Sequence, residues 1–510
     1  MSRSDISDVG SSAGPPGYGE KVTTALDGMS PQKPLDSPDG IGVAGSTACG
    51  SVVRIELAME TGVIRDTRYS AYGCPATLAA ARYAAEAVRG LSLAEAALVG
   101  EQTIASALEV GLDKITSIQN ATDALHRALG AALLRDSHSI CDTNKAHEGV
   151  LVGMSGGVDS TVAALLLKQE EYEVAGVTLM LWTEADSEGE RSCCSADAVR
   201  RARRVAHSFG IPHFTVDASA AFYDRIVEYF VAGYKAGQTP NPCAKCNSRV
   251  RFGLMSDLAS KLGMNWVATG HYARLVGPDR LLARGVDALK DQSYVLSEVP
   301  AAVLREVIFP LGEMTKSQVR QIATEVGFEG YEAPESQEIC FISDDDHRRF
   351  LRERIGERPG LIVDRAGHTL GAHSGTYNFT IGQRKGLGIS SPNPVYVVCI
   401  DAAEAKITVG EADELKVAAV TIGALTWHRM PRGIEVQLQV RSAGLPLPGV
   451  IAVSIGDREK DVAGTGLESA ESIDIELSEP GHGVACGQTA VVYSNEEVVC
   501  AGTIMATRPA

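Results

Sequence analysis

The most constraining feature of this chain is the segment VLVGMSGGVDS at residues 150–160. An apolar run ends in SGGVDS at 155–160, and an apolar helical pattern, TVAALLLKQ, begins at once. Adjacent glycines let the backbone turn tightly and approach an anion with no Cβ in the way. The free amides at the start of the helix point at that anion, and the helix dipole favours its negative charge. The segment therefore predicts a phosphate cradle between a buried strand and a helix.

No Lys follows these glycines, so the segment is not the G-x-x-x-x-G-K-[ST] loop of nucleotide hydrolases. It resembles the pyrophosphate loop (PP-loop) of ATP pyrophosphatases, which adenylate a substrate oxygen and release pyrophosphate. The resemblance implies that ATP is the cofactor. Asp159 lies beside the expected phosphates and is the expected Mg²⁺ anchor, because that ion prefers hard oxygen ligands.

The pattern of the chain changes several times along its 510 residues. The first residues are rich in Ser, Gly and Pro and are expected to be disordered, because they bury too little apolar surface to offset chain entropy. After residue 149, strand and helix patterns alternate, which predicts a parallel sheet with helices on both faces. Short β-type runs with Gly and Pro turns follow, which predicts small barrels. The expected parts are a disordered segment 1–46, an α+β unit 47–140, a linker 141–148, an α/β PP-loop domain 149–348, a small β domain 349–412 and a C-terminal β-barrel 413–510.

Composition narrows the function. The net charge of −17 argues against indiscriminate nucleic-acid binding, because phosphate contacts need Lys and Arg side chains. A local basic groove is still compatible with this net charge. No apolar stretch is long enough to span a bilayer and the start lacks a signal-peptide core, so a cytoplasmic protein without a membrane partner is expected. Eleven cysteines in such a chain favour thiol, sulfur or metal chemistry over a disulfide framework.

Three cysteines stand out: Cys243 and Cys246 in QTPNPCAKCNSRVRF, and Cys340 in ESQEICFIS. The prolines of the first segment predict a rigid, extended loop that presents its thiols. The neighbouring Lys and Arg side chains are expected to lower the thiol pKa. Such a thiolate attacks, carries a persulfide or binds a metal. Half of a zinc knuckle, completed by the pair at 193–194 or by Cys340, is the structural alternative.

Six motifs occur in a fixed order: the PP-loop, NPCAKCN (241–247), ATGHYAR (268–274), KDQSYVL (290–296), SQEICFI (336–342) and GQRKGLGI (382–389). Together, over about residues 149–505, they resemble the bacterial tRNA-specific 2-thiouridylase family (MnmA/TrmU). The resemblance implies an adenine nucleotide alpha hydrolase-like fold. It also implies a tRNA-uridine 2-sulfurtransferase, which adenylates the C2 oxygen of uridine 34 and then transfers sulfur, releasing AMP and pyrophosphate.

The resemblance also implies roles for individual residues. Cys246 matches the catalytic thiol and Cys340 matches the persulfide carrier. The implied ATP-binding residues are Gly153, Met154, Ser155, Gly156, Gly157, Val158, Asp159, Ser160, Leu179 and Gly270. The implied tRNA-binding residues are Asn241, Pro242, Cys243, His271, Lys290, Asp291, Gln292, Arg441, Ser442 and Gln488. The implied partners are the anticodon loop of lysine, glutamate or glutamine tRNAs and a cysteine desulfurase or sulfur carrier.

Cys243 departs from the family pattern, because many members have Asp at this position. Two mechanisms therefore compete. In the first, Cys340 carries a persulfide and Cys246 helps to free the sulfide, which closes a Cys246–Cys340 disulfide. In the second, Cys243, Cys246 and Cys340 hold a [4Fe-4S] cluster whose open iron binds hydrosulfide.

The first unit resembles the NifU/IscU-like iron–sulfur scaffold family through ACGS around Cys49, YGCPAT around Cys74 and ALHRAL around His126. The family uses an Asp and a third Cys, where this chain has Ser51 and Arg127. Cys49, Cys74 and His126 remain as candidate iron–sulfur or zinc ligands, but without a fourth ligand a stable cluster is not expected. A domain that receives persulfide sulfur, or only docks its donor, fits better, and fusion raises the effective donor concentration. A degenerate domain kept for folding is the alternative.

Two rival functions remain. Another PP-loop adenylating ligase needs ATP but no reactive thiols. An iron–sulfur assembly protein with a vestigial PP-loop needs a cluster on the first unit.

Overall fold

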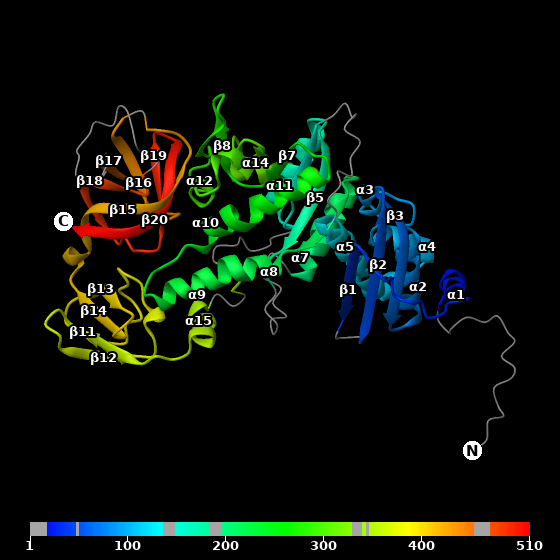
Figure 1. Cartoon of the computed structure of the whole chain (residues 1–510), viewed down its shortest axis with the longest axis horizontal. Helices are drawn as coiled ribbons and strands as arrows, with labels where there is room; N and C mark the ends of the chain where they lie inside the picture. The colour runs from blue at the N-terminus through cyan, green and yellow to red at the C-terminus, as the bar shows by residue number, and fades with distance from the viewer. Residues whose placement is uncertain are drawn as a thin grey trace, which may run out of the picture.

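The computed structural model describes residues 18–46, 50–135, 148–182, 195–328, 339–342, 346–431, 433–452 and 470–510. Cys49, Cys193 and Cys194, which the sequence singles out, lie outside these ranges. Figure 1 shows an N-terminal unit, a nucleotide unit and two β units at the C-terminal end. Within the described residues, no helix is long and apolar enough to cross a membrane.

The N-terminal unit is a three-stranded antiparallel sheet, in the order β1-β2-β3, with helices packed against it. Strands β2 and β3 are joined at Thr61 and Gly62, both with positive φ. Its elements are α1 (Glu20–Leu26), β1 (Gly40–Ser46), β2 (Ser51–Glu60), β3 (Val63–Tyr72), α2 (Pro75–Glu86), α3 (Leu93–Ala96), α4 (Glu101–Leu108) and α5 (Ile115–Arg135).

The expectation that residues 1–46 are disordered is wrong for residues 18–46, which include α1 and β1. The glycines of β1, taken as a sign of disorder, permit close packing. A Cβ at Gly42 would lie 1.9 Å from the carbonyl oxygen of Ala124 on α5, and one at Gly40 would lie 2.1 Å from that of Ala128. Strand β1 therefore belongs to the core of the unit. Residues 1–17 lie outside the described ranges.

The nucleotide unit is built on a five-stranded parallel sheet in the order β10-β7-β4-β5-β6, which confirms the expected α/β class. Strand β4 is central, and its residues 150–152 are fully buried. The elements are β4 (Gly149–Gly153), α6 (Val158–Gln169), β5 (Glu173–Met180), α7 (Ala196–Ser208), β6 (His213–Asp217), α8 (Ser219–Phe222), α9 (Glu228–Lys235), α10 (Pro242–Cys246), α11 (Phe252–Lys261), β7 (Trp266–Thr269), β8 (Ala273–Val276), β9 (Leu281–Arg284), α12 (Ser293–Leu296), α13 (Ala301–Leu304), β10 (Val307–Ile308), α14 (Lys316–Glu325) and α15 (His347–Ile355).

Helix α5 joins the first two units, and Figure 1 shows it between β1 and the nucleotide unit. Its apolar side chains Leu125, Leu129 and Leu133 share one continuous hydrophobic core with Phe214 and Val216 of edge strand β6. A Cβ at residue 130, a glycine, would lie 1.9 Å from a carbonyl oxygen of β6. The two units are therefore packed together and are not merely tethered.

Two β units follow. The middle one is a four-stranded sheet in the order β12-β11-β14-β13. In the last one, β15 pairs with both β18 and β20 and so closes a barrel, as expected. The hairpin β8–β9 of the nucleotide unit extends the barrel sheet beside β20, which the sequence does not indicate. The strands are β11 (Gly360–Val363), β12 (Thr369–His373), β13 (Tyr396–Asp401), β14 (Lys406–Gly410), β15 (Lys416–Trp427), β16 (Glu435–Gln439), β17 (Leu447–Ala452), β18 (Ser472–His482), β19 (Thr489–Ser494) and β20 (Glu497–Pro509).

Candidate functional site

The loop between β4 and α6 has the geometry that SGGVDS predicts. Gly156 has φ +75°, and a Cβ there would lie 2.5 Å from the carbonyl oxygen of Ala198 on α7. The Ser155 amide donates to Ser160 Oγ at 3.1 Å, which closes the turn on itself. Gly270, after β7, packs so closely that a Cβ would lie 2.8 Å from the Ser160 nitrogen. The loop between β4 and α6 is therefore packed against its neighbours backbone to backbone, with no side chain between them.

A cavity of about 660 Å³ opens over this loop. It brings together segments from four of the motifs and one residue from the barrel unit. The expected site residues that line it are Gly153, Met154, Ser155, Asp159, Ser160, Leu179, Gly270, His271, Lys290, Asp291, Gln292, Cys340 and Ser442. The other loop residues, Gly156, Gly157 and Val158, lie in the turn at the start of α6. A thiol and the nucleotide loop thus share one cavity.

Lys316 is a cavity residue that the sequence reasoning missed. It stands at the start of α14, and its Nζ lies 2.7 Å and 2.8 Å from the two carboxylate oxygens of Asp159. The Tyr272 hydroxyl donates to the same carboxylate at 2.7 Å. The loop lacks a lysine of its own, and Lys316 places one beside it from a distant part of the sequence. The local signal is the capping box of Thr315 and Gln318, which predicts where the helix begins. It does not predict that the start of this helix lies beside the nucleotide loop.

These contacts bear on the expected Mg²⁺ site. Within the described ranges, no group of three or more His, Cys, Asp or Glu side chains is placed to hold a metal ion. Mg²⁺ in nucleotide sites keeps waters and phosphate oxygens and needs only one or two carboxylates. Asp159 therefore fits as a single ligand to a metal carried by ATP, provided that it exchanges its contact with Lys316.

The NPCAKC segment is helical, so the expectation of an extended loop is wrong. Helix α10 begins at Pro242, and the Asn241 side chain accepts from the amides of Cys243 at 3.1 Å and Ala244 at 3.3 Å. Proline suits the first helical position because its missing N–H has no partner there, and Asn is a preferred cap before it. The pair Asn-Pro is therefore a helix start. Cys243 and Cys246 are held one turn apart at fixed positions.

The thiols differ in environment. Cys246 is buried, and it belongs to one hydrophobic cluster with Phe341 and the half-buried Cys340. Cys243 is exposed. The surrounding protein nevertheless raises the pKa of the Cys243 thiol to about 11, mainly by desolvation and then through Cys246, against the opposing effect of Arg251.

The expectation that nearby cations lower the pKa of Cys243 is therefore wrong. Lys245 is buried and pairs with Glu298 at 2.6 Å, so its charge is neutralised locally. Arg249 lies over the Tyr229 ring at 5.2 Å. Cys243, Cys246 and Cys340 also do not form a metal-binding group within the described residues. The [4Fe-4S] alternative therefore stays a prediction, and Cys340 lines the cavity.

His271 lies at the cavity beside the end of β7. Its Nδ1 is 2.7 Å from Thr269 Oγ1, and burial, followed by Arg251, lowers the pKa of the ring to about 3. The ring is therefore neutral near pH 7. A neutral imidazole suits a hydrogen bond to a nucleobase better than an ionic contact with a phosphate.

The remaining expected tRNA residues fall into two places. Asp291 and Gln292 line the main cavity but also hold the chain: Asp291 accepts from the Gly285 amide at 3.0 Å, and Gln292 accepts from the Tyr272 amide at 2.9 Å. Arg441 and Gln488 line a second cavity of about 330 Å³. It lies between the barrel and the segment 380–383 of the middle unit, which includes the start of the GQRKGLGI motif.

In the N-terminal unit, Cys74 is the N-cap residue of α2. Its sulfur lies 3.3 Å from Ser117 Oγ and 3.4 Å from Thr77 Oγ1. Burial acts to raise the pKa of this thiol, but hydrogen bonds from Ser117, Thr77 and Tyr18 outweigh it and lower the pKa to about 7. Cys74 is therefore partly ionised at neutral pH, which makes it a nucleophile.

His126 has a different neighbourhood from the one that a metal site requires. The ring is fully buried, with Nδ1 2.8 Å from the carbonyl oxygen of His213 and Nε2 3.0 Å from that of Val99. Both nitrogens are thus occupied by main-chain carbonyls at the contact with the nucleotide unit. This placement argues against the predicted ligand role of His126, while the full set with Cys49 stays a prediction because Cys49 lies outside the described ranges.

Comparisons with known proteins agree with this division of the chain. Residues 19–137 match the NifU-like N terminal domain, 148–344 the tRNA methyl transferase HUP domain, 348–411 the tRNA methyl transferase PRC-barrel domain, and 417–504 the aminomethyltransferase beta-barrel domain. Among solved structures, a nitrogen-fixing NifU-like protein (N-terminal) from Brucella abortus is 20% identical with a TM-score of 0.21, covering 23% of this chain and 95% of that chain.

Curated relatives match at higher identity. The tRNA-specific 2-thiouridylase MnmA of Geobacter metallireducens is 42% identical over 374 residues, which cover 71% of this chain and 98% of the relative. The bifunctional protein NifU/MnmA of Rubrobacter xylanophilus is 42% identical over 508 residues, which cover 97% of this chain and 100% of the relative. Both resemblances seen in the sequence are confirmed by a relative that carries the two parts in one chain. This chain therefore belongs to the family of bifunctional NifU/MnmA proteins.

Proposed function

We propose that this protein is an ATP-dependent tRNA 2-thiouridylase that acts on uridine 34. The observation that carries the proposal is the single cavity that holds the PP-loop, His271 and Cys340. An adenylating ligase needs the loop alone, whereas a sulfurtransferase also needs a thiol beside the activated oxygen. The 2-thiouridylase relatives that match 70–71% of this chain support the same interpretation.

The chemistry uses two steps. ATP adenylates the C2 oxygen of the uracil ring, with pyrophosphate as the leaving group, and Lys316 balances negative charge beside the loop. The terminal sulfur of a persulfide on Cys340 then attacks C2, and the C2–O bond breaks to release AMP. The Cys246 thiolate next attacks the Cys340 sulfur and cleaves the S–S bond, which leaves sulfur on C2. The product enzyme has a Cys246–Cys340 disulfide, which an external dithiol reduces.

The shared hydrophobic cluster of Cys246 and Cys340 supports this route, because the two thiols must meet. The helical segment that holds Cys246 brings one partner to a fixed position. We propose that the open second cavity at Arg441 and Gln488 contacts the tRNA backbone, since arginine is the usual partner of phosphate oxygens.

We propose that the N-terminal unit accepts sulfur at Cys74 from a cysteine desulfurase or sulfur carrier. The Cys74 thiolate attacks the outer sulfur of the donor persulfide, and the donor thiolate leaves. The pKa of about 7 supports this role, since the thiolate is the attacking form.

The decisive experiment incubates the purified full chain with ATP, magnesium, a cysteine desulfurase with L-cysteine as the persulfide donor, a dithiol and unmodified tRNA. Mass spectrometry of the digested tRNA should show the mass of 2-thiouridine. Cys340→Ser should abolish the product but keep tRNA-dependent pyrophosphate release. Cys399→Ser, which changes an exposed thiol of β13, is the matched control and should thiolate normally. Absence of the product with the wild-type protein would disprove the proposal.

A further inference from the structure

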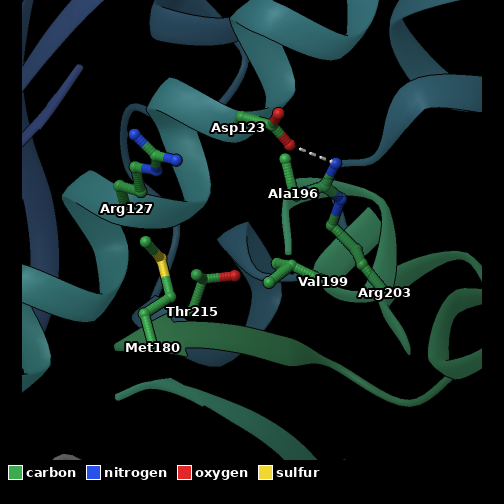
Figure 2. A pocket seen from close by; sticks show the side chains of 7 residues that line it. All are labelled: Asp123, Arg127, Met180, Ala196, Val199, Arg203 and Thr215. Atoms are coloured by element: carbon green, nitrogen blue, oxygen red, sulfur yellow. Dashed lines mark hydrogen bonds and ion pairs between the residues drawn. The ribbon is translucent and has the colours of Figure 1, made fainter. Parts of the chain in front are cut away.

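The contact between the N-terminal unit and the nucleotide unit is buried and charged. Asp123, on α5, accepts from Arg203 Nη2 at 2.7 Å and pairs with Arg200 at 2.8 Å, and both arginines belong to α7. Figure 2 shows the Asp123–Arg203 contact beside a cavity of about 80 Å³ between α5 and the strands and helix of the nucleotide unit. Arg203 is 1% exposed. Because breaking a buried pair leaves an uncompensated charge, this contact holds α5 and α7 in register.

Helix α7 in turn touches the nucleotide loop. The carbonyl oxygen of Ala198 lies where a Cβ of Gly156 would be, at 2.5 Å. Ala198 lies on the same helix, two residues before Arg200 and five before Arg203, the arginines that bind Asp123. The position of α7, which the N-terminal unit fixes, therefore sets the space in which the loop turns.

A second route runs through the sheet. His126 on α5 contacts the carbonyl oxygen of His213 at 2.8 Å. The His213 ring is fully buried on β6, and its Nε2 lies 2.9 Å from Thr178 Oγ1 on β5. The Thr178 hydroxyl donates its single proton to the carbonyl oxygen of Met154, in the loop, at 2.7 Å. His213 Nε2 must therefore be the donor to Thr178, which fixes the ring as its Nε2–H tautomer.

We propose that the docked N-terminal unit holds the nucleotide loop in its binding conformation, with Asp123 and His213 as positioning residues. The inference rests on the proposed function, because it takes the loop to bind ATP. Both routes start on α5 and end on the loop, one at Gly156 and one at Met154. The N-terminal unit then supports the nucleotide loop from behind, in addition to any supply of sulfur.

The test measures the affinity of the full-length protein for a non-hydrolysable ATP analogue by calorimetry, without tRNA. His213→Leu should raise the dissociation constant by about 2- to 10-fold, as expected for one lost hydrogen bond. His213→Gln should restore the affinity to within about twofold, since the Gln amide can donate in place of Nε2–H. Asp123→Asn should weaken binding in the same direction. In turnover, KM for ATP should rise in both weakened variants while kcat stays near the wild-type value.

Thr67→Val is the matched control. Thr67 is fully buried in the N-terminal unit, where its hydroxyl donates to the Ala85 carbonyl oxygen at 2.8 Å, a contact that involves neither α7 nor β6. Thr67→Val should lower the melting temperature and leave the nucleotide affinity unchanged. Equal losses of affinity in Thr67→Val and His213→Leu, or an unchanged affinity in both His213→Leu and Asp123→Asn, would overturn the inference.

The two proposals fail separately. A wild-type protein that binds the ATP analogue but forms no 2-thiouridine contradicts the thiouridylase proposal and leaves the positioning test intact. A wild-type protein that forms 2-thiouridine, with variants that bind ATP normally, contradicts the positioning role alone.

Discussion

At the scale of single residues, the protein tunes its thiols in opposite directions. Cys74 sits at the N-cap of a helix among three hydroxyl groups, and its pKa is lowered to about 7. Cys243 is exposed, yet its pKa is raised to about 11. A cation near a thiol in sequence is therefore a poor guide, because Lys245 is already bound to Glu298. Hydrogen-bond donors aimed at the sulfur decide the outcome for Cys74.

This difference predicts a pH profile for alkylation by iodoacetamide. The reactive thiolate of Cys74 should appear as the pH rises through about 7, whereas Cys243 should stay largely unmodified below pH 9. Ser117→Ala removes the largest of the contributions that lower the pKa of Cys74, so its midpoint should move upward. Peptide mass spectrometry at a series of pH values measures both sites in one sample. A Cys74 midpoint near the ordinary value of 9 would refute the prediction.

Lys316 yields a second prediction at this scale. Its ammonium group lines the nucleotide cavity and pairs with Asp159. We expect Asp159 to turn to the metal carried by ATP, which releases the ammonium group to face the phosphates. Hydrogen bonds to charged groups are worth about 1.5–3 kcal/mol, so Lys316→Gln should raise KM for ATP about tenfold or more. Lys235→Gln, at an exposed position of α9, is the control and should not change it. Steady-state kinetics with varied ATP measures the effect, and equal KM values in the two variants would contradict it.

At the scale of elements, the effect of a helical glycine on stability depends on its packing as well as on its helix propensity. Gly130 lies in α5 against the backbone of β6, where a Cβ would be 1.9 Å from the Thr215 oxygen, and Gly253 lies in α11 with nothing within 4 Å. Alanine is the better helix former by about 0.8–1 kcal/mol. Gly253→Ala should therefore stabilise the protein by roughly that amount. Gly130→Ala should destabilise it by about 1–3 kcal/mol, because overpacking forces the two units apart. Urea unfolding of both variants tests this, and a stabilising Gly130→Ala would show that α5 is not packed on β6 as described.

Periodicity predicted elements that bury an apolar stripe, such as β4 with α6. The sequence-based predictions were wrong where one residue type occurs in two kinds of local structure. Asn-Pro before Cys243 suggested an extended loop, although Asn as a cap and Pro at the first helical position together begin α10. The glycines of β1 suggested disorder, although their missing Cβ atoms let α5 pack closely against the strand. The PP-loop and Cys340 could be predicted from the sequence, because each lies in a local motif. Contacts between distant segments, such as Lys316 with Asp159, leave no local pattern in the sequence.

At the scale of the whole molecule, the shared core of the first two units predicts how a shortened chain behaves. Leu125, Leu129 and Leu133 of α5 cover Phe214 and Val216 of β6, and all five side chains are fully buried. A fragment that begins at residue 148 loses this cover and exposes the apolar face of β6 to water, which favours aggregation. We expect the fragment to bind a hydrophobic dye and to unfold at a lower temperature than the nucleotide unit in the full chain. Two domains joined only by a tether would instead unfold independently, so an identical melting temperature and no dye binding would show that α5 contributes nothing to the nucleotide unit.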